Sequence, residues 1–237
     1  MSESIETRLA ALPWETLFRS LDEDGFATTG PLLADGEAAT ARGWYDRAEL
    51  FRSRVVMRRH GFGAGEYQYF QRPLPDLVAS LRAALYVRTV PLANRWHEAL
   101  RLERRFPPTF DRFIADCHAA GQDRPTPLLL RYGPGDYNRL HQDLYGPHVF
   151  PIQMAILLDE PGVDFEGGEF ALVEQRPRSQ SRVEVVPLRR GEAVLFAVNW
   201  RPGYGARGAF RLTMRHGVSR IRRGRRHCLG IICHDAA

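Results

Sequence analysis

The 237-residue sequence contains no lysine, so all 33 of its basic side chains other than histidine are arginines. Arginine binds carboxylates and phosphates through a planar fork, and any anion site in this chain is expected to use that geometry. Cysteine is also scarce, and Cys117, Cys228 and Cys233 lack the CxxC spacing typical of zinc or redox motifs. This cysteine usage favours a reducing compartment, the cytoplasm.

Long apolar runs are missing as well. No segment approaches the roughly 20 apolar residues that span a bilayer, so no membrane partner is expected. The first residues, MSESIETRLAALPWETLF, lack a charged region followed by an apolar one, which predicts no signal peptide and supports a cytoplasmic location. Composition and length are those of a globular chain without repeats, and we predict a single domain over residues 1–237.

Basic charge is concentrated near the C-terminus. Nine arginines and no acidic residue lie between Arg201 and Arg226. This distribution is compatible with an anionic substrate or with nucleic acid. Solubility together with one or two functional arginines explains it equally well at this stage.

The first half of the chain has the pattern of helices. Helices are predicted within residues 1–50, with a further short one at 43–53, and over 76–100 and 109–120, because apolar residues recur there at helical spacing. Residues 66–70 alternate as in a strand, after a glycine-rich bend. We expect residues 1–125 to be mainly helical, to support the fold and to form the substrate side.

From residue 126 onward the pattern is that of short strands separated by glycine and proline. Such spacing is typical of a β-sandwich or barrel. The predicted fold class is therefore α+β, with a double-stranded β-helix (jelly-roll) at 126–237 and the helical half packed on it.

Three residues in this second half have the chemistry of a metal site. His141 and Asp143 are two apart, which places both side chains on one face of a strand. His216 follows Leu212 and Met214 on the apolar face of a later strand. Two imidazoles and one carboxylate occupy one face of an octahedral iron(II) ion and leave positions for an oxoacid and O2. Arg226, ten residues after His216, is placed to bind the far carboxylate of such an oxoacid.

The order HxD, distal histidine and G-x-R resembles the iron(II)/2-oxoglutarate-dependent dioxygenase superfamily in its prolyl-hydroxylase-like form. The segment GGEF at Gly167–Phe170 is also similar to that group. The segments RHGFGAGEYQYF, LLLRYGPGDYNRLHQD and HGVSRIRRGRRHCLGII look like a bacterial family of oxygenases proposed to act on alkylated nucleic acid.

The resemblance implies a fold, a reaction and a set of site residues. Iron(II), 2-oxoglutarate and O2 are the implied cofactor and co-substrates, and decarboxylation of 2-oxoglutarate is coupled to hydroxylation of a second substrate. The metal is expected at His141, Asp143 and His216. Arg226 binds 2-oxoglutarate, helped by Tyr132 and Gln153, and Arg225 is the competing anchor because some relatives space the arginine at nine residues.

The second substrate stays open. Oxidative demethylation of alkylated nucleic acid, hydroxylation of prolyl or amino-acid-like substrates, and a non-oxidative cupin-like metal protein are the alternatives. A cupin usually brings a clustered HxH, which this chain lacks. The expected wall of the substrate pocket comprises Arg58, Arg59, His60, Glu66 and Tyr67. The sequence does not define the oligomeric state.

Overall fold

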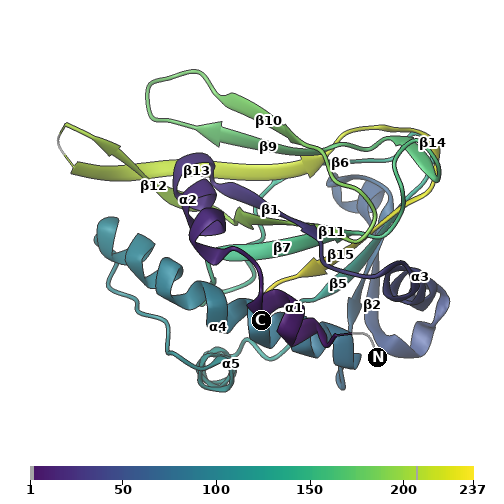
Figure 1. Cartoon of the computed structure of the whole chain (residues 1–237), viewed down its shortest axis with the longest axis horizontal. Coiled ribbons are helices and arrows are strands. Elements are labelled where there is room, and N and C mark those ends of the chain that lie inside the picture. Colours follow the sequence, from purple (N-terminus) through teal and green to yellow (C-terminus); the bar gives the residue numbers. More distant parts are fainter. Residues whose placement is uncertain (1–2, 207) are drawn as a thin grey trace.

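The computed structural model describes residues 3–206 and 208–237. Antiparallel strands form two large sheets that enclose the functional cavity described below. Figure 1 shows the sheets as stacked layers, with α4, α5 and α1 on the outer side of the seven-stranded sheet. Helices packed against antiparallel sheets confirm the predicted α+β class.

Five α-helices and three short 3-10 helices lie in the first half of the chain. Buried apolar residues at helical spacing, such as Phe113 and Cys117, fix the inward face of α5. Gly25 ends α2 in the left-handed conformation, where glycine carries no steric penalty. The bounds are α1 Ile5–Ala10, α2 Trp14–Asp24, α3 Asp35–Gly43, η1 Trp44–Asp46, η2 Ala48–Leu50, η3 Met57–His60, α4 Asp76–Ala99 and α5 Phe110–Ala119.

The larger sheet has seven strands in the order β1-β11-β7-β15-β5-β4-β2. Strand β7, in the interior of this sheet, is buried along its whole length, as expected for a strand covered on both faces. The bounds are β1 Phe26–Pro31, β2 Phe51–Val56, β4 Glu66–Phe70, β5 Leu128–Tyr132, β7 Ile152–Leu157, β11 Glu192–Ala197 and β15 Arg226–Ile231.

The smaller sheet runs β10-β9-β13-β6-β3, with β12 paired to β13. Its longest strand, β13, alternates buried and more exposed side chains over Leu212–His216, so Met214 and His216 point inward as predicted. A separate pair joins β14 to β8. The bounds are β3 Gly63–Ala64, β6 Tyr137–His141, β8 Phe165–Gly167, β9 Phe170–Gln175, β10 Arg182–Val186, β12 Trp200–Gly205, β13 Gly208–Val218 and β14 Ile221–Gly224.

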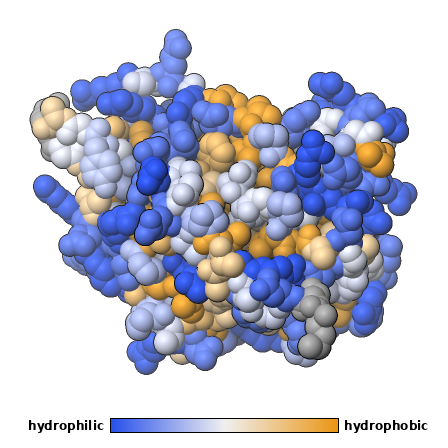
Figure 2. Space-filling view, in the orientation of Figure 1, coloured by the Kyte–Doolittle hydropathy of each residue, from blue (hydrophilic) through white to orange (hydrophobic). Residues whose placement is uncertain are grey.

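The apolar core has two main parts. The larger cluster packs the helices against the outer face of the seven-stranded sheet, with Tyr86, Trp96 and Phe150 among its members. The second fills the space between the sheets and includes Tyr132, Phe170 and Phe196. Figure 2 shows hydrophilic residues over most of one face of the molecule, with apolar residues gathered toward its middle.

The helical and β-rich halves are less separate than the sequence predicts. Helices do dominate residues 1–125, but β1, β2 and β4 from this half complete the seven-stranded sheet, and β3 joins the other sheet. The short helix predicted at 43–53 is wrong in its second part. Two 3-10 turns end at Leu50, and the chain then enters β2.

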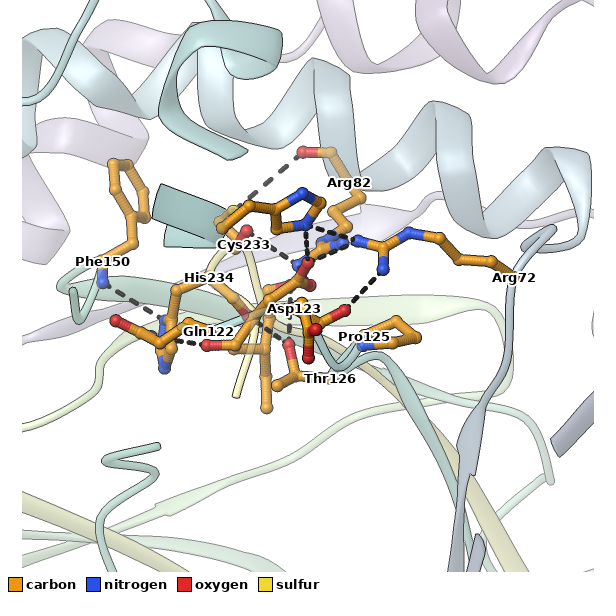
Figure 3. Close-up of polar contacts among 12 residues, drawn as sticks. Arg72, Arg82, Gln122, Asp123, Pro125, Thr126, Phe150, Cys233 and His234 are labelled. Carbon is orange, nitrogen blue, oxygen red and sulfur yellow. Dashed lines mark hydrogen bonds and ion pairs between the residues drawn. The ribbon is translucent and has the colours of Figure 1, made fainter. Parts of the chain in front are cut away.

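A polar network fastens the segment after β15 to the helices (Figure 3). Asp235 is fully buried and accepts a 2.6 Å hydrogen bond from Arg82 of α4. Arg72 and His118 contact its other carboxylate oxygen. Arg82 also donates to the backbone carbonyls of Ile232 and Cys233. The network therefore holds the end of the strand that contains Arg226 against α4.

Replacing Asp235 by asparagine is expected to lower the free energy of unfolding by about 3–5 kcal/mol, because the buried Arg82 loses its counter-charge. Burial by itself raises the pKa of Asp235, but the charge and hydrogen bond of Arg82 outweigh it and lower the pKa. The carboxylate therefore stabilises the fold above its unfolded pKa of about 4, and this contribution disappears as the pH falls below that value. Urea denaturation between pH 3 and 7 measures the difference.

The control is Asp46→Asn, since the Asp46 side chain is 84% exposed and its partner Arg131 lies 3.3 Å away at the surface. Its expected effect is below about 1 kcal/mol. An Asp235→Asn protein that is as stable as the control at pH 7 would show that the network contributes little to stability.

Candidate active site

A cavity of about 340 Å³ lies between the two sheets. It has the size and the mostly apolar lining of small-molecule sites. Its polar lining comprises Tyr67, Tyr132, Asn138, Arg139, His141, Gln142, Asp143, Tyr145, Gln153, His216 and Arg226. The three predicted metal ligands and the three predicted 2-oxoglutarate contacts, Arg226, Tyr132 and Gln153, therefore share one cavity.

His141, Asp143 and His216 form the cluster predicted to bind metal. Their ligand atoms all lie within 4.8 Å of one another. His141 ends β6 and is the direct cross-strand partner of His216 on β13, so their rings are 4.2 Å apart. Asp143 reaches both rings, with its carboxylate oxygens 3.6 Å from His141 Nε2 and 3.4 Å from His216 Nε2.

Asp143 differs in one respect from its predicted placement. Strand β6 ends at His141, and Asp143 lies beyond it in irregular backbone. Strand alternation therefore does not orient this carboxylate. Two hydrogen bonds hold it instead: Tyr145 donates its hydroxyl at 2.6 Å to one oxygen, and the Gln153 amide donates at 2.8 Å to the other.

The protonation states suit a divalent metal. Burial alone raises the pKa of Asp143, but the hydrogen bond and charge of His216, with His141 and Tyr145, outweigh it and keep the carboxylate ionised. Burial and the neighbouring His141 lower the pKa of His216, which favours the neutral imidazole that binds metals. The His141 Nδ1 lies 2.7 Å from the carbonyl of Arg139. A proton on that nitrogen leaves Nε2, the atom facing Asp143, free as a ligand.

Replacing Tyr145 by phenylalanine is expected to weaken Mn(II) or Fe(II) binding roughly 10- to 100-fold, the usual effect of losing a partner that orients a metal ligand. Burial and the adjacent Asp143 raise the pKa of Tyr145 well above its usual value, so its hydroxyl stays protonated and donates to the carboxylate. Calorimetric titration with Mn(II) measures the change. Tyr204→Phe, on an exposed tyrosine of β12, is the control. Equal affinities in the two variants would exclude this role for Tyr145.

Arg226 begins β15 and points into the same cavity from the opposite sheet. Its side chain is buried, with 2% of the residue exposed, and its Nε and Nη1 atoms have no hydrogen-bond partner among the described residues. Tyr132 is its cross-strand partner on β5, and the guanidinium carbon lies 5.8 Å from the Tyr132 ring centre. An unpaired buried guanidinium is costly, and an anionic ligand would satisfy it.

The G-x-R spacing has a local structural cause. Gly224 has a φ of +78°, and a Cβ there would collide with the Asp164 carbonyl oxygen, so glycine is required before β15. Arg225 then faces outward and is exposed, and its backbone amide is bonded to the same carbonyl. Arg226, Cys228 and Gly230 all line the cavity, as strand alternation predicts.

The residues predicted to form the substrate wall divide into three groups. Tyr67 lines the cavity. Arg58 and Glu66 line a neighbouring recess, together with Arg225. Arg59 and His60 are exposed beside Gly61 and Phe62, which do line the cavity.

Three positions that were not singled out from the sequence belong to the site in the structure: Phe62 and Leu140 line the cavity, and Tyr145 lines it and donates to Asp143. Phe62 lies within the quoted segment RHGFGAGEYQYF and Leu140 directly precedes His141. Phe62 and Leu140 therefore lie within segments that the sequence already marks as motifs. Tyr145, two residues after Asp143, gave no signal of its own.

Comparison with known proteins places the chain in a family. Residues 65–236 match a family described as "oxygenase, catalysing oxidative methylation of damaged DNA". Two curated relatives from Mycobacterium tuberculosis, in strains CDC 1551 and H37Rv, are 47% identical over 168 residues. The match covers 71% of this chain and 72% of each relative, and both relatives are described as uncharacterized.

Solved structures with a similar fold include two prolyl hydroxylases and an oxidoreductase of the 2OG-Fe(II) oxygenase family. A prolyl hydroxylase from Trichoplax adhaerens, in complex with a hypoxia-inducible-factor peptide, gives a TM-score of 0.60 at 10% identity over 99% of this chain and 94% of that one. A Pseudomonas putida prolyl-4-hydroxylase gives 0.57 at 15% identity over 94% and 99%. A 2OG-Fe(II) oxygenase family oxidoreductase from Burkholderia pseudomallei gives 0.52 at 16% over 94% and 93%.

The family confirms that the chain is an oxygenase, as predicted from the sequence. The fold, which is similar to that of a 2OG-Fe(II) oxygenase, and the His-Asp-His cluster agree with the iron(II)- and 2-oxoglutarate-dependent chemistry that the sequence predicts. Within that class, the chain belongs to the oxygenase family matched over residues 65–236. Among the described residues, no helix is both long and apolar enough to span a bilayer.

Proposed function

We propose that this protein binds iron(II) at His141, Asp143 and His216, binds 2-oxoglutarate at Arg226, and oxidises alkyl groups on damaged nucleic acid. The observation that carries the proposal is the buried Arg226, with Nε and Nη1 unpartnered, in the same cavity as the triad. The two requirements of the co-substrate, a metal at one end and a cation at the other, are met by residues on opposite sheets.

The residues present fit the implied groups. Two imidazoles and one carboxylate are the donor set that suits iron(II) with positions left open. The planar fork of Arg226 suits a carboxylate, which would satisfy its free nitrogens. Tyr132 is in place to contact that carboxylate beside Arg226, with its hydroxyl 3.3 Å from the Asn138 amide nitrogen. Bound iron and 2-oxoglutarate supply the oxidation of a C–H bond by O2.

The chain's own residues position and shield that chemistry. Tyr145 and Gln153 fix the Asp143 carboxylate. Phe170 and Phe196 pack near His216, with ring centres 6.0 and 4.7 Å from its ring, and exclude water from that side. Gln153 was predicted to bind the co-substrate. Its amide nitrogen is used by Asp143, and its Oε1 is buried without a partner among the described residues. We propose that Gln153 mainly holds the metal ligand.

The family description supports damaged DNA as the substrate. Hydroxylation of an N-methyl group releases formaldehyde and leaves the demethylated base, so an oxygenase would remove methyl groups. The excess of arginine favours a polyanionic substrate as well. We further propose that the two sheets form the predicted double-stranded β-helix within one domain. We place the protein in the cytoplasm, because its three cysteines are free thiols.

Succinate and formaldehyde production test the proposal. The purified full chain is incubated with iron(II), ascorbate, air and 2-oxoglutarate, with and without an oligonucleotide that carries one 1-methyladenine. Succinate that rises with the methylated oligonucleotide, together with formaldehyde in equal amount, is expected. Succinate stimulated only by a proline-containing peptide would favour the prolyl-hydroxylase alternative. Absence of succinate under every condition would exclude the proposed chemistry.

A further inference from the structure

The mouth of the cavity is unusually apolar for an exposed surface. Phe62 and Leu140 both line the cavity, yet they are 49% and 47% exposed. Exposed large apolar side chains at the rim of a pocket mark a contact surface for a ligand or partner. Phe62 lies on the segment between η3 and β3, and Leu140 lies on β6.

Phe62 is held in place by its neighbours. Its ring stacks on His60, with ring centres 5.3 Å apart and planes 21° from parallel. Its backbone carbonyl accepts a 2.9 Å hydrogen bond from the amide of Arg139. Directly after it, β3 pairs with β6, where Gly63 is the partner of Asn138. The exposed ring is therefore part of a pre-formed surface, which lowers the entropic cost of binding.

Exposed arginines lie close to Phe62 along the chain or in the cavity lining: Arg59 directly precedes His60 on η3, and Arg139, whose amide bonds to the Phe62 carbonyl, lines the cavity. Arg58, Arg59 and Arg139 are exposed, and within residues 3–206 and 208–237 their side chains form no ion pair or hydrogen bond. Among the described residues that line the cavity, Asp143 is the only acid, and it is buried at the triad. An aromatic ring flanked by free arginines matches the combination by which proteins hold single strands: base stacking together with phosphate contacts.

We propose that Phe62, backed by His60, is a stacking platform for single-stranded DNA at the mouth of the cavity. In this arrangement one base stacks on Phe62, and the damaged base enters the cavity toward the triad. Arg59 and Arg139 contact the adjacent phosphates. A single strand is required because a base inside a duplex cannot reach a recessed metal without leaving the stack. This inference rests on the proposed function and assigns residues for its substrate specificity.

Binding of a fluorescein-labelled oligothymidylate dodecamer to the full chain, followed by anisotropy, tests the platform. Phe62→Ala and Phe62→Leu are expected to weaken binding about 5- to 100-fold, the range of one lost base–aromatic stack. Phe62→Trp retains a π surface and is expected to stay within about threefold of wild type. Tyr204→Ala, which removes a ring that is 65% exposed on β12, is the matched control. A Phe62→Leu protein that binds the oligonucleotide as tightly as wild type would overturn the stacking role of Phe62.

The salt dependence of oligonucleotide binding tests the proposed phosphate contacts of the arginines. Each phosphate contact on a single strand contributes about 0.7 to the slope of log K against log salt. Arg59→Gln and Arg139→Gln are each expected to reduce the slope by about that amount, whereas Arg215→Gln, on the exposed side of β13, is expected to leave it unchanged. Equal slopes in all these variants would overturn the phosphate contacts.

Formaldehyde release separates failure of the platform from failure of the proposed function. Release from a methylated oligonucleotide with equal KM in wild type and Phe62→Leu would overturn the platform and leave the function standing. Binding that depends on Phe62, without formaldehyde from any methylated oligonucleotide, would support the platform and contradict the demethylation.

Discussion

A His216→Ala protein is expected to make no measurable succinate or formaldehyde, because a single histidine and Asp143 remain to hold the metal. The loss of activity should be far larger than the roughly 10- to 100-fold effect that follows when only a residue that hydrogen-bonds a metal ligand is removed. His216 is 7% exposed and its Nε2 faces Asp143. Among the described residues that line the cavity, the other histidine is His141, which is itself a proposed ligand, so no histidine remains to replace His216. Mn(II) titration should show a matching loss of affinity, which separates a metal defect from a defect in substrate binding.

A matched control for this variant is His148→Ala. His148 is partly buried, but it is outside the cavity lining and is held through its backbone amide, which donates to Gln122. We expect this variant to retain metal affinity and activity within about twofold, as for ordinary substitutions away from special sites. A His216→Ala protein that binds Mn(II) like the control would show that the metal lies elsewhere.

The triad and Arg226 were predictable because their positions depend on local rules. Strand alternation places His216 beside Met214 and Leu212 on an inward face, and the same rule separates Arg226 from Arg225. A spacing of two residues also brought His141 and Asp143 together, although Asp143 is outside the strand. The three side chains therefore lie together as expected, and their role as metal ligands stays a prediction, whereas the strand geometry expected for Asp143 was wrong.

The residues that sequence reasoning missed depend on contacts between distant segments. Phe62 belongs to the mouth because the amide of Arg139, 77 positions later in the numbering, bonds to its carbonyl. Tyr145 donates to Asp143 because the loop after β6 folds back over that carboxylate. Similarly, β1 joins the larger sheet by pairing with β11, far along the chain. Residue patterns within a short window predict which face of a helix or strand is buried, but they do not predict which distant segment will cover that face.

Replacing Arg226 by glutamine is expected to raise the KM for 2-oxoglutarate by about 30-fold or more, equivalent to about 2 kcal/mol for the loss of one partner of a buried charge pair. Arg226→Lys should give an intermediate value, since an ammonium group lacks the fork that matches a carboxylate. Arg225→Gln is the control, because Arg225 directly precedes β15 and is exposed, and its replacement should change KM by less than twofold. A larger effect at Arg225 than at Arg226 would reverse the assignment.

Stability without 2-oxoglutarate should change in the opposite direction. Because Arg226 is 2% exposed and has two unpartnered nitrogens, its charge destabilises the ligand-free fold. The glutamine variant is therefore expected to melt at a higher temperature than wild type when no ligand is present. Added 2-oxoglutarate should raise the melting temperature of the metal-loaded wild type, because it binds only the folded state, and should leave the variant nearly unchanged. A variant less stable than wild type in the absence of ligand would show that Arg226 supports the fold itself. Higher stability of the ligand-free variant together with weaker 2-oxoglutarate binding is the result expected if the role of Arg226 is to bind the ligand.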